Sequence, residues 1–223
     1  MKARQTGFTL VEIAIVLVII GLLLGGILKG QGMITQAKIK NVIADFSGVS
    51  AAYHGYQDRY RAIPGDDPNA ATRWAVAPIA VAGNGNGVVA GAYNSGVVGD
   101  ESRLWWDHLR RAGFVSGNGT QQPFNAVTGL IGVQTGDGQA AVGPTMLNAA
   151  GGNGFVGLIM CSANLPDKIA IAVDTQMDDG ASNLGTVRAL LQAAPNPAVG
   201  AAQVATAAYA ETSTNIYTIC RSL

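Results

Sequence analysis

The chain has 223 residues, of which 13% are charged, and its 14 basic residues balance its 14 acidic ones. A net charge of zero provides no basic field of the kind that attracts nucleic acid, so we expect no direct nucleic-acid partner. Few charges and 30 glycines suit either a protein whose surface is largely covered by copies of itself or an uncharged, loop-rich extracellular domain.

An apolar run opens the chain, from Phe8 to Leu28, 21 residues with a single charge at Glu12. A helix of this length, at about 1.5 Å per residue, spans roughly the 30 Å hydrocarbon core of a bilayer, so we expect a membrane segment over residues 8–28. Two basic residues precede the run, and basic flanks stay in the cytoplasm, so the residues after Lys29 are expected outside. A cleaved signal peptide is the alternative, but its apolar region is only about 7–15 residues long and ends at a small-residue cleavage site.

Glu12 is the feature of this run that a plain membrane anchor does not explain. A charged side chain in the membrane interior costs about 2.5–3.5 kcal/mol on insertion scales, and somewhat less near a helix end. The carboxylate has no evident partner within its own chain. We therefore expect a cation from another molecule to neutralise it.

The residues around this acid resemble the amino terminus of type IV prepilins and type II secretion pseudopilins. The resemblance consists of a short basic leader, the sequence Gly7-Phe8-Thr9-Leu10-Val11-Glu12 and the apolar helix that follows. It implies that residues 1–7 are a leader, that prepilin peptidase cuts between Gly7 and Phe8, and that the same enzyme methylates the new amino group of Phe8. It also implies that Glu12 acts in assembly, paired with the amino terminus of a neighbouring copy.

The same resemblance implies a filament subunit that polymerises with copies of itself or with related pilins. An inner-membrane assembly platform with its ATPase would extract the subunit from the bacterial inner membrane, with the amino terminus cytoplasmic and the outer domain periplasmic. The filament would then lie in the periplasm or on the cell surface. A pilus subunit and a pseudopilin of a type II secretion piston are alternatives, and a membrane-tethered binding protein that does not polymerise is a third. Loss of Lys2 and Arg4 with the leader would leave 12 basic against 14 acidic residues.

Beyond the membrane segment, apolar residues recur at alternating steps of three and four. This spacing predicts one apolar face of a helix, and its tyrosines favour packing on a sheet of the same chain over a coiled coil. Pro64-Gly65 is expected to end the helix, so residues 29–63 continue the membrane segment as a spine of roughly 55 residues in all. The face consists of Ile39, Val42, Phe46, Val49, Tyr53, Tyr56, Tyr60 and Ile63.

Residues 64–223 are expected to form one globular outer domain, giving an α+β fold in which the long helix packs on a C-terminal antiparallel sheet. The Asn-Gly pairs of residues 83–87 predict a loop tip, and residues 192–214 predict a surface loop. An amphipathic helix is expected at Glu101–Ala112, with its tryptophans packed on the domain. Strands are expected at Phe155–Cys161, Lys168–Val173, Thr186–Leu190 and Ile216–Cys220.

Cys161 and Cys220 are the only cysteines in the chain. The predicted topology places both in an oxidising compartment, where such pairs usually bond. We expect a disulfide that fixes the last strand to the sheet, and two buried thiols are the alternative.

Asp174, Asp178 and Asp179 place three carboxylates within six residues at the end of a predicted strand. Ca²⁺ takes six to eight oxygen ligands, so these carboxylates and nearby loop carbonyls are a candidate calcium site. The resemblance supports it, because some pseudopilins hold calcium in a loop near the C-terminus. The spacing is not that of an EF-hand, and a plain Asp-Gly hairpin turn is the alternative.

Catalytic signatures are not found in the sequence. The two histidines are far apart, and there is no G-x-S-x-G elbow, no H-E-x-x-H, no Walker loop and no dinucleotide fingerprint. We expect a structural protein that requires no cofactor, and not an enzyme.

Overall fold

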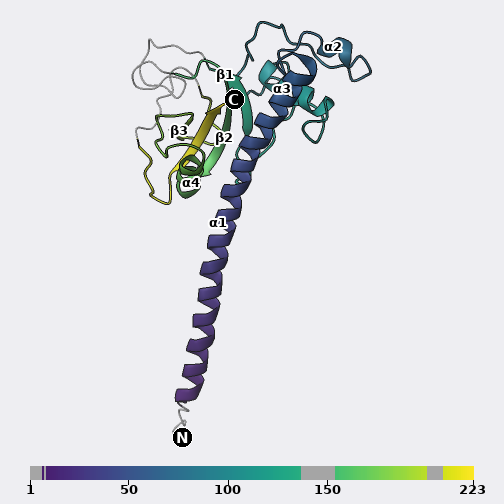
Figure 1. The fold of residues 1–223 in the computed structure, drawn as a ribbon. Helices are drawn as coiled ribbons and strands as arrows, with labels where there is room; N and C mark the ends of the chain where they lie inside the picture. The colour runs from purple at the N-terminus through teal and green to yellow at the C-terminus, as the bar shows by residue number, and fades with distance from the viewer. Residues whose placement is uncertain (1–6, 8, 137–153, 200–207) are drawn as a thin grey trace. The chain divides into compact units, whose positions relative to one another are not determined.

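The computed structural model describes residues 7, 9–136, 154–199 and 208–223. In this part of the chain a long amino-terminal helix is followed by three shorter helices and a sheet of four antiparallel strands (Figure 1). The predicted α+β class is confirmed. The elements are α1 (Leu10–Tyr60), α2 (Ala70–Arg73), α3 (Glu101–Arg111), β1 (Ile131–Thr135), β2 (Leu158–Pro166), α4 (Asp167–Met177), β3 (Val187–Leu191) and β4 (Ile216–Ser222).

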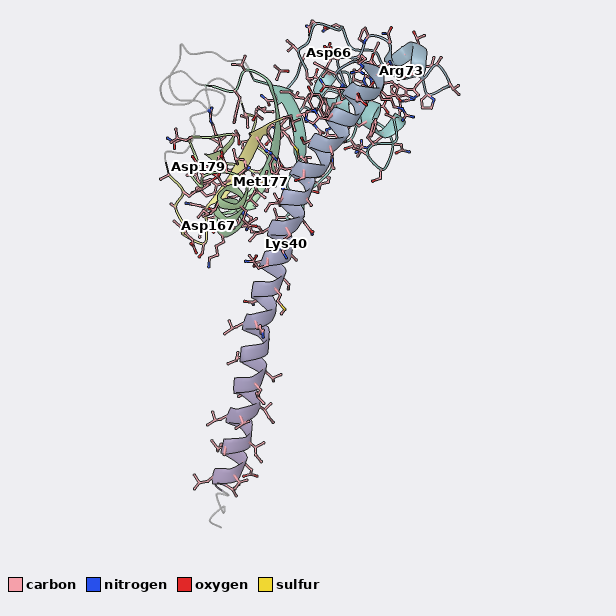
Figure 2. All side chains as sticks on the ribbon, viewed as in Figure 1. Lys40, Asp66, Arg73, Asp167, Met177 and Asp179 are labelled. Carbon is pink, nitrogen blue, oxygen red and sulfur yellow. A yellow bond between two sulfur atoms is a disulfide. The ribbon has the colours of Figure 1, made fainter. Side chains whose placement is uncertain are left out.

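The chain divides into two compact units, of which the first ends at Lys38 and the second is Ile39–Leu223. The first unit contains the amino-terminal half of α1, whose side chains project on all sides (Figure 2). Its most apolar 18-residue window has a mean hydropathy of 2.8 and none of it is buried. By length and composition, α1 alone among the described helices is suited to cross a membrane. The helix stays continuous through Gly25 and Gly26.

The sheet of the second unit has the strand order β1-β2-β4-β3, so the last strand of the chain lies between β2 and β3. All neighbouring strands are antiparallel. Because successive side chains of a strand point to opposite faces, Ile219 and Cys220 of β4 enter different apolar clusters. The cluster of Ile219 also contains buried residues of α1, α3 and α4, and the cluster of Cys220 contains Tyr93, Phe155 and Val199.

Helix α1 packs in the first of these clusters through the face that its apolar spacing predicted. Five of the eight predicted residues are buried, and the other three are partly buried against the same cluster. The helix ends at Tyr60, earlier than predicted, because Arg61 has a φ of 54° and this left-handed conformation closes the helix before Pro64 is reached.

The strand predicted at Lys168–Val173 is wrong, because these residues belong to helix α4. The alternation of isoleucine with alanine imitated a strand, yet alanine is the best helix former. The buried positions include Ile169, Ala170 and Val173, which is the spacing of a helix face. Pro166 precedes the helix, and a proline at this boundary is a helix-start signal that the strand prediction overlooked.

The other strand predictions were closer. Strands β3 and β4 agree with the predicted segments to within one or two residues, and the strand expected at Phe155–Cys161 begins at Leu158 and continues to Pro166. Strand β1 was missed, although its Ile131 and Val133 alternate with smaller or polar residues and both are buried. Helix α3 was predicted correctly, and Trp105 and Trp106 are fully buried in the domain.

Candidate functional site

The predicted cleavage point lies just before α1. Gly7 is exposed, and no atom lies within 4 Å of the place where a Cβ would be. On the Gly7 side of the predicted cut there is therefore room for the close approach of a protease. Phe8, on the other side of the predicted cut, lies outside the described residues, as do residues 1–6.

Glu12 does have a partner in its own chain, which corrects the expectation from the sequence. The backbone N–H and the hydroxyl of Thr9 both donate to Oε2 of Glu12, each at 2.8 Å. The N–H of Glu12 in turn donates to Oγ1 of Thr9 at 3.3 Å. This reciprocal pattern is a capping box, in which a Thr and the Glu three residues later satisfy the free N–H groups at a helix start. The sequence Thr9-x-x-Glu12 is the signal that could have predicted it.

The disulfide joins Cys161 of β2 to Cys220 of β4, the two central strands of the sheet. The two residues lie directly opposite each other in the antiparallel pair, and both are fully buried. A covalent bond thus ties the last strand to a point 59 residues earlier in the chain. The structure holds a disulfide here, and not two buried thiols.

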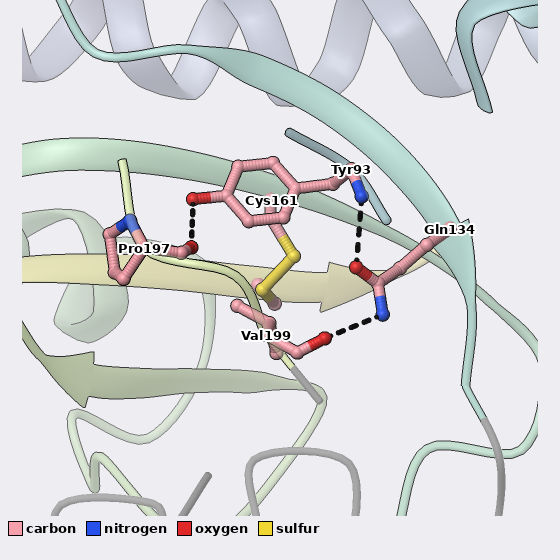
Figure 3. Close-up of a disulfide and its surroundings, with 6 residues drawn as sticks. Tyr93, Gln134, Cys161, Pro197 and Val199 are labelled. Atoms are coloured by element: carbon pink, nitrogen blue, oxygen red, sulfur yellow. Dashed lines mark hydrogen bonds between the residues drawn. A yellow bond between two sulfur atoms is a disulfide. The ribbon is translucent and has the colours of Figure 1, made fainter. Parts of the chain in front are cut away.

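Hydrogen bonds brace the loops on the disulfide's side of the sheet (Figure 3). The hydroxyl of Tyr93 donates to the carbonyl of Pro197 at 2.8 Å, and its backbone N–H donates to Oε1 of Gln134 at 3.0 Å. Nε2 of Gln134 donates to the carbonyl of Val199 at 2.9 Å. These bonds connect the segment before α3, strand β1 and the segment after β3. The disulfide is therefore covered by segments that are hydrogen-bonded to one another.

Asp174, Asp178 and Asp179 meet at the carboxyl end of α4. One oxygen from each carboxylate lies within 4.8 Å of the others. The helix, and not the predicted strand, brings Asp174 and Asp178 together, because residues four apart are neighbours on a helix. Asp174 is fully buried, Asp178 is half-buried and Asp179 is exposed.

Hydrogen bonds occupy only part of this cluster. The hydroxyl of Tyr209 donates to Oδ2 of Asp174 at 2.6 Å, whereas Oδ1 of Asp174 is buried without a hydrogen-bond partner among the described residues. The pKa of Asp174 is raised by burial and by the neighbouring carboxylates of Asp179 and Asp178. Burial of a carboxylate is costly without a compensating charge, and Ca²⁺ accepts carboxylate, carbonyl and water oxygens as ligands. The oxygen donors of the cluster therefore fit calcium.

A buried polar cluster next to α1 was missed in the sequence. Tyr56 donates to Oδ2 of Asp67 at 2.6 Å, and Arg73 donates to the same oxygen. Burial alone would raise the pKa of Asp67, but hydrogen bonds from Tyr56 and Arg73 lower it. Nearby, Nδ1 of His108 accepts the N–H of Gly65 at 2.9 Å, and Nε2 bonds the carbonyl of Val81 at 2.8 Å. These groups satisfy one another and hold the segments after α1 in place.

The start of the chain resembles a known family of sequences. Residues 2–28 match the family model described as the prokaryotic N-terminal methylation motif. Searches of curated proteins and of solved structures gave no significant match. The matched segment includes Gly7, the capping box of Thr9 and Glu12, and the most apolar part of α1. The chain therefore carries a prokaryotic N-terminal methylation motif of the prepilin and pseudopilin type.

Proposed function

We propose that the chain is a structural subunit of a type IV pilus-like filament, assembled through the first half of α1 after its leader is removed. The observation that carries this proposal is the uncovered apolar surface within the methylation motif: Leu10 is 91% exposed and Leu22 is 74% exposed. Burying one such side chain contributes about 1.5–3 kcal/mol. A bilayer would provide that environment before assembly, and neighbouring copies would provide it in the filament.

Processing would come first. Prepilin peptidase would cut between Gly7 and Phe8 and methylate Phe8, and an assembly platform with its ATPase would then extract the subunit. We expect Gly7→Leu to leave uncut precursor in the membrane, because the added side chain blocks the protease. Gly32→Leu is the matched control, since the space around Gly32 is also open. The mass of the N-terminal peptide distinguishes the two, and residues 1–7 still attached in assembled wild-type filaments would overturn the proposal.

Glu12 would serve two purposes in turn. In the single chain both hydrogen bonds from Thr9 are donated to Oε2 of Glu12. We propose that Oε1 forms an ion pair with the amino group of Phe8 on a neighbouring copy. Such a pair would offset the cost of a carboxylate inside an apolar fibre core. The capping box would persist while the pair forms.

Two variants separate the charge of Glu12 from its capping role. Glu12→Gln keeps a residue that can close a capping box but removes the charge, whereas Thr9→Val removes the capping hydroxyl and keeps the charge. We expect Glu12→Gln to insert, lose its leader and fold, yet yield few filaments, and Thr9→Val to yield many. Filament yield is compared at equal membrane abundance. The opposite ranking would show that capping, and not charge pairing, limits assembly.

The location of the filament distinguishes a pilus from its alternatives. Immunogold labelling of intact cells should show long external fibres if the chain is a pilus subunit. Assembly confined to the periplasm would make it a pseudopilin of a type II secretion system. A chain that keeps its leader and never polymerises would be a membrane-tethered binding protein.

A calcium site is a second proposal, favoured by Oδ1 of Asp174, which has no hydrogen-bond partner in the part of the chain that the structure describes. Asp174, Asp178 and Asp179 would supply carboxylate oxygens, and carbonyls or water the remainder. Calcium should raise the melting temperature of the detergent-solubilised protein relative to chelator. Asp174→Asn and Asp178→Asn should abolish that rise, and Asp58→Asn, on the exposed part of α1, should keep it. An equal rise in all three variants would remove the site.

A further inference from the structure

We propose that Asn118 is a site of spontaneous deamidation, and that the reaction places a carboxylate in the cavity lined by Arg110 and Arg111. The cavity has a volume of about 500 Å³ and is also lined by Asp107, Asn118 and Gly119. This proposal is independent of filament assembly. It depends on the contrast between this Asn-Gly pair and two others in the same chain.

The reaction needs only water. The backbone nitrogen of the residue after asparagine loses its proton and attacks the side-chain Cγ, and the C–N bond to the amide nitrogen breaks so that ammonia leaves. The resulting succinimide ring is then opened by water, which gives aspartate or isoaspartate. A following glycine favours the attack because it has no Cβ to block the approach. The attack also requires that the glycine N–H be free.

Asn118 and Gly119 meet these requirements. Both are exposed, and a Cβ at Gly119 would have no atom within 4 Å. Within the described residues, neither the side chain of Asn118 nor the N–H of Gly119 makes a hydrogen bond. Nη1 of Arg110 donates to the carbonyl of Gly119 at 2.7 Å. This contact places a positive charge beside the same residue whose nitrogen must become negative, and a cation nearby favours that charge.

The pairs Asn84-Gly85 and Asn86-Gly87 have the same sequence but the opposite environment. The N–H of Gly85 donates to Oδ1 of Asp66 at 2.6 Å, and the N–H of Gly87 donates to Oδ2 of Asp66 at 2.7 Å. One buried carboxylate thus holds both of the nitrogens that would have to attack, and its negative charge opposes their deprotonation. A fourth pair begins at Asn153, outside the described residues.

The side-chain oxygens of the protected pairs are occupied as well. Oδ1 of Asn84 accepts the N–H of Asn86 at 2.9 Å, and Oδ1 of Asn86 accepts the N–H of Val88 at 2.8 Å. These bonds restrict the rotation of both side-chain amides. Asp66 is therefore a protecting residue for residues 83–87, and residues 117–119 have no equivalent among the described residues.

The new charge would change the cavity at residue 118. Arg111 is already paired with Asp107 at 2.6 Å, whereas the acceptors of Arg110 among the described residues are carbonyls, those of Ser116 and Gly119. A carboxylate at position 118 would give Arg110 an ionic partner and lower the net charge of the chain by one. The isoaspartate product would also lengthen the main chain at this turn.

The test is an incubation of the folded, detergent-solubilised full chain in mildly alkaline buffer made with ¹⁸O-water. Chymotrypsin cuts after Phe114 and Phe124 and isolates Asn118 from the peptide that carries Asn84 and Asn86. We expect the mass of the Asn118 peptide to increase by the difference between OH and NH₂ plus the extra mass of one ¹⁸O. The mass of the peptide that carries Asn84 and Asn86 should remain unchanged. Equal rates in the two peptides of the folded protein would overturn the proposal.

Two controls separate folding from chemistry. In urea all three pairs should react at similar rates, because Asp66 no longer binds the glycine N–H groups. Gly119 has a φ of 70°, which an alanine adopts only under strain, so Gly119→Ala is compared with wild type in urea. There it should slow the reaction at Asn118 several-fold, because the added Cβ hinders the attack. An unchanged rate in Gly119→Ala would show that succinimide formation is not the route and would also overturn the proposal.

Discussion

The two halves of α1 are both apolar, yet they differ in how they are stabilised. Before Lys38 the apolar side chains surround the helix and none of the most apolar window is buried. From Ile39 onward they occupy one face, and that face is buried with the sheet. A helix that is apolar on one side can be stabilised by its own domain, whereas a helix that is apolar all round needs lipid or other protein. The pattern of apolar residues, and not their number, therefore distinguishes the folding half from the half that needs a partner.

The largest expected effect is the loss of stability when a buried side chain in the second half of α1 is shortened. Phe46 is fully buried, so Phe46→Ala should lower the free energy of unfolding of the second unit by about 3–5 kcal/mol. Leu24 is 55% exposed, so Leu24→Ala should leave that free energy unchanged. Urea unfolding of the detergent-solubilised protein measures both. Equal destabilisation by the two variants would contradict the division of α1 into two halves.

The next effect belongs to the disulfide and should also be confined to the second unit. The double variant Cys161→Ala/Cys220→Ala should lose about 2–4 kcal/mol of stability, because the unfolded chain is no longer constrained by the bond. Membrane insertion through the first half of α1 should be unaffected. Wild-type protein unfolded with and without reductant provides the matched control. Identical urea midpoints in the two conditions would show that the bond adds no stability.

A smaller effect is a dependence of stability on pH that arises from His108. Burial lowers the pKa of His108, and protonation would break the bond that Nδ1 accepts from Gly65. The pKa of His108 in the folded state lies below the unfolded value of about 6.5. The stability that neutral His108 contributes is therefore fully present above about pH 6.5 and is lost as the pH falls through the folded pKa. The slope should not exceed about 1.4 kcal/mol per pH unit.

Histidine variants identify the source of that slope. His108→Gln should flatten the dependence of the urea midpoint between neutral and mildly acidic pH. His54→Gln should not, because His54 is exposed on α1. A slope that persists unchanged in His108→Gln would assign the acid sensitivity to other groups.

Local patterns predicted much of this fold. The three- and four-residue spacing located the buried face of α1, and the β-branched runs located β3 and β4. The amphipathic pattern of residues 101–112 located α3. These elements have one dominant signal each, because their burial pattern agrees with their intrinsic propensity.

Prediction from the sequence failed where two signals compete or where the interacting residues are distant in sequence. At α4, residues 168–173 alternate like a strand but contain strong helix formers, and the helix is decided by burial against the sheet. The acids at its end were recognised, but Tyr209 was not, because it lies 35 residues from Asp174. The protection of Asn84 and Asn86 by Asp66 is of the same kind, since only the folded loop brings them together.

The disulfide also determines how the protein responds to force. When the chain is pulled from its two ends, tension passes directly from β4 to β2 through the sulfur atoms. The residues between Cys161 and Cys220 then remain outside the loaded path, and roughly 200 Å of contour length cannot be released. Helix α4 and strand β3 lie within that shielded loop. Under load, the part of the second unit before Cys161 should therefore unfold, whereas the segment between Cys161 and Cys220 should not be extended.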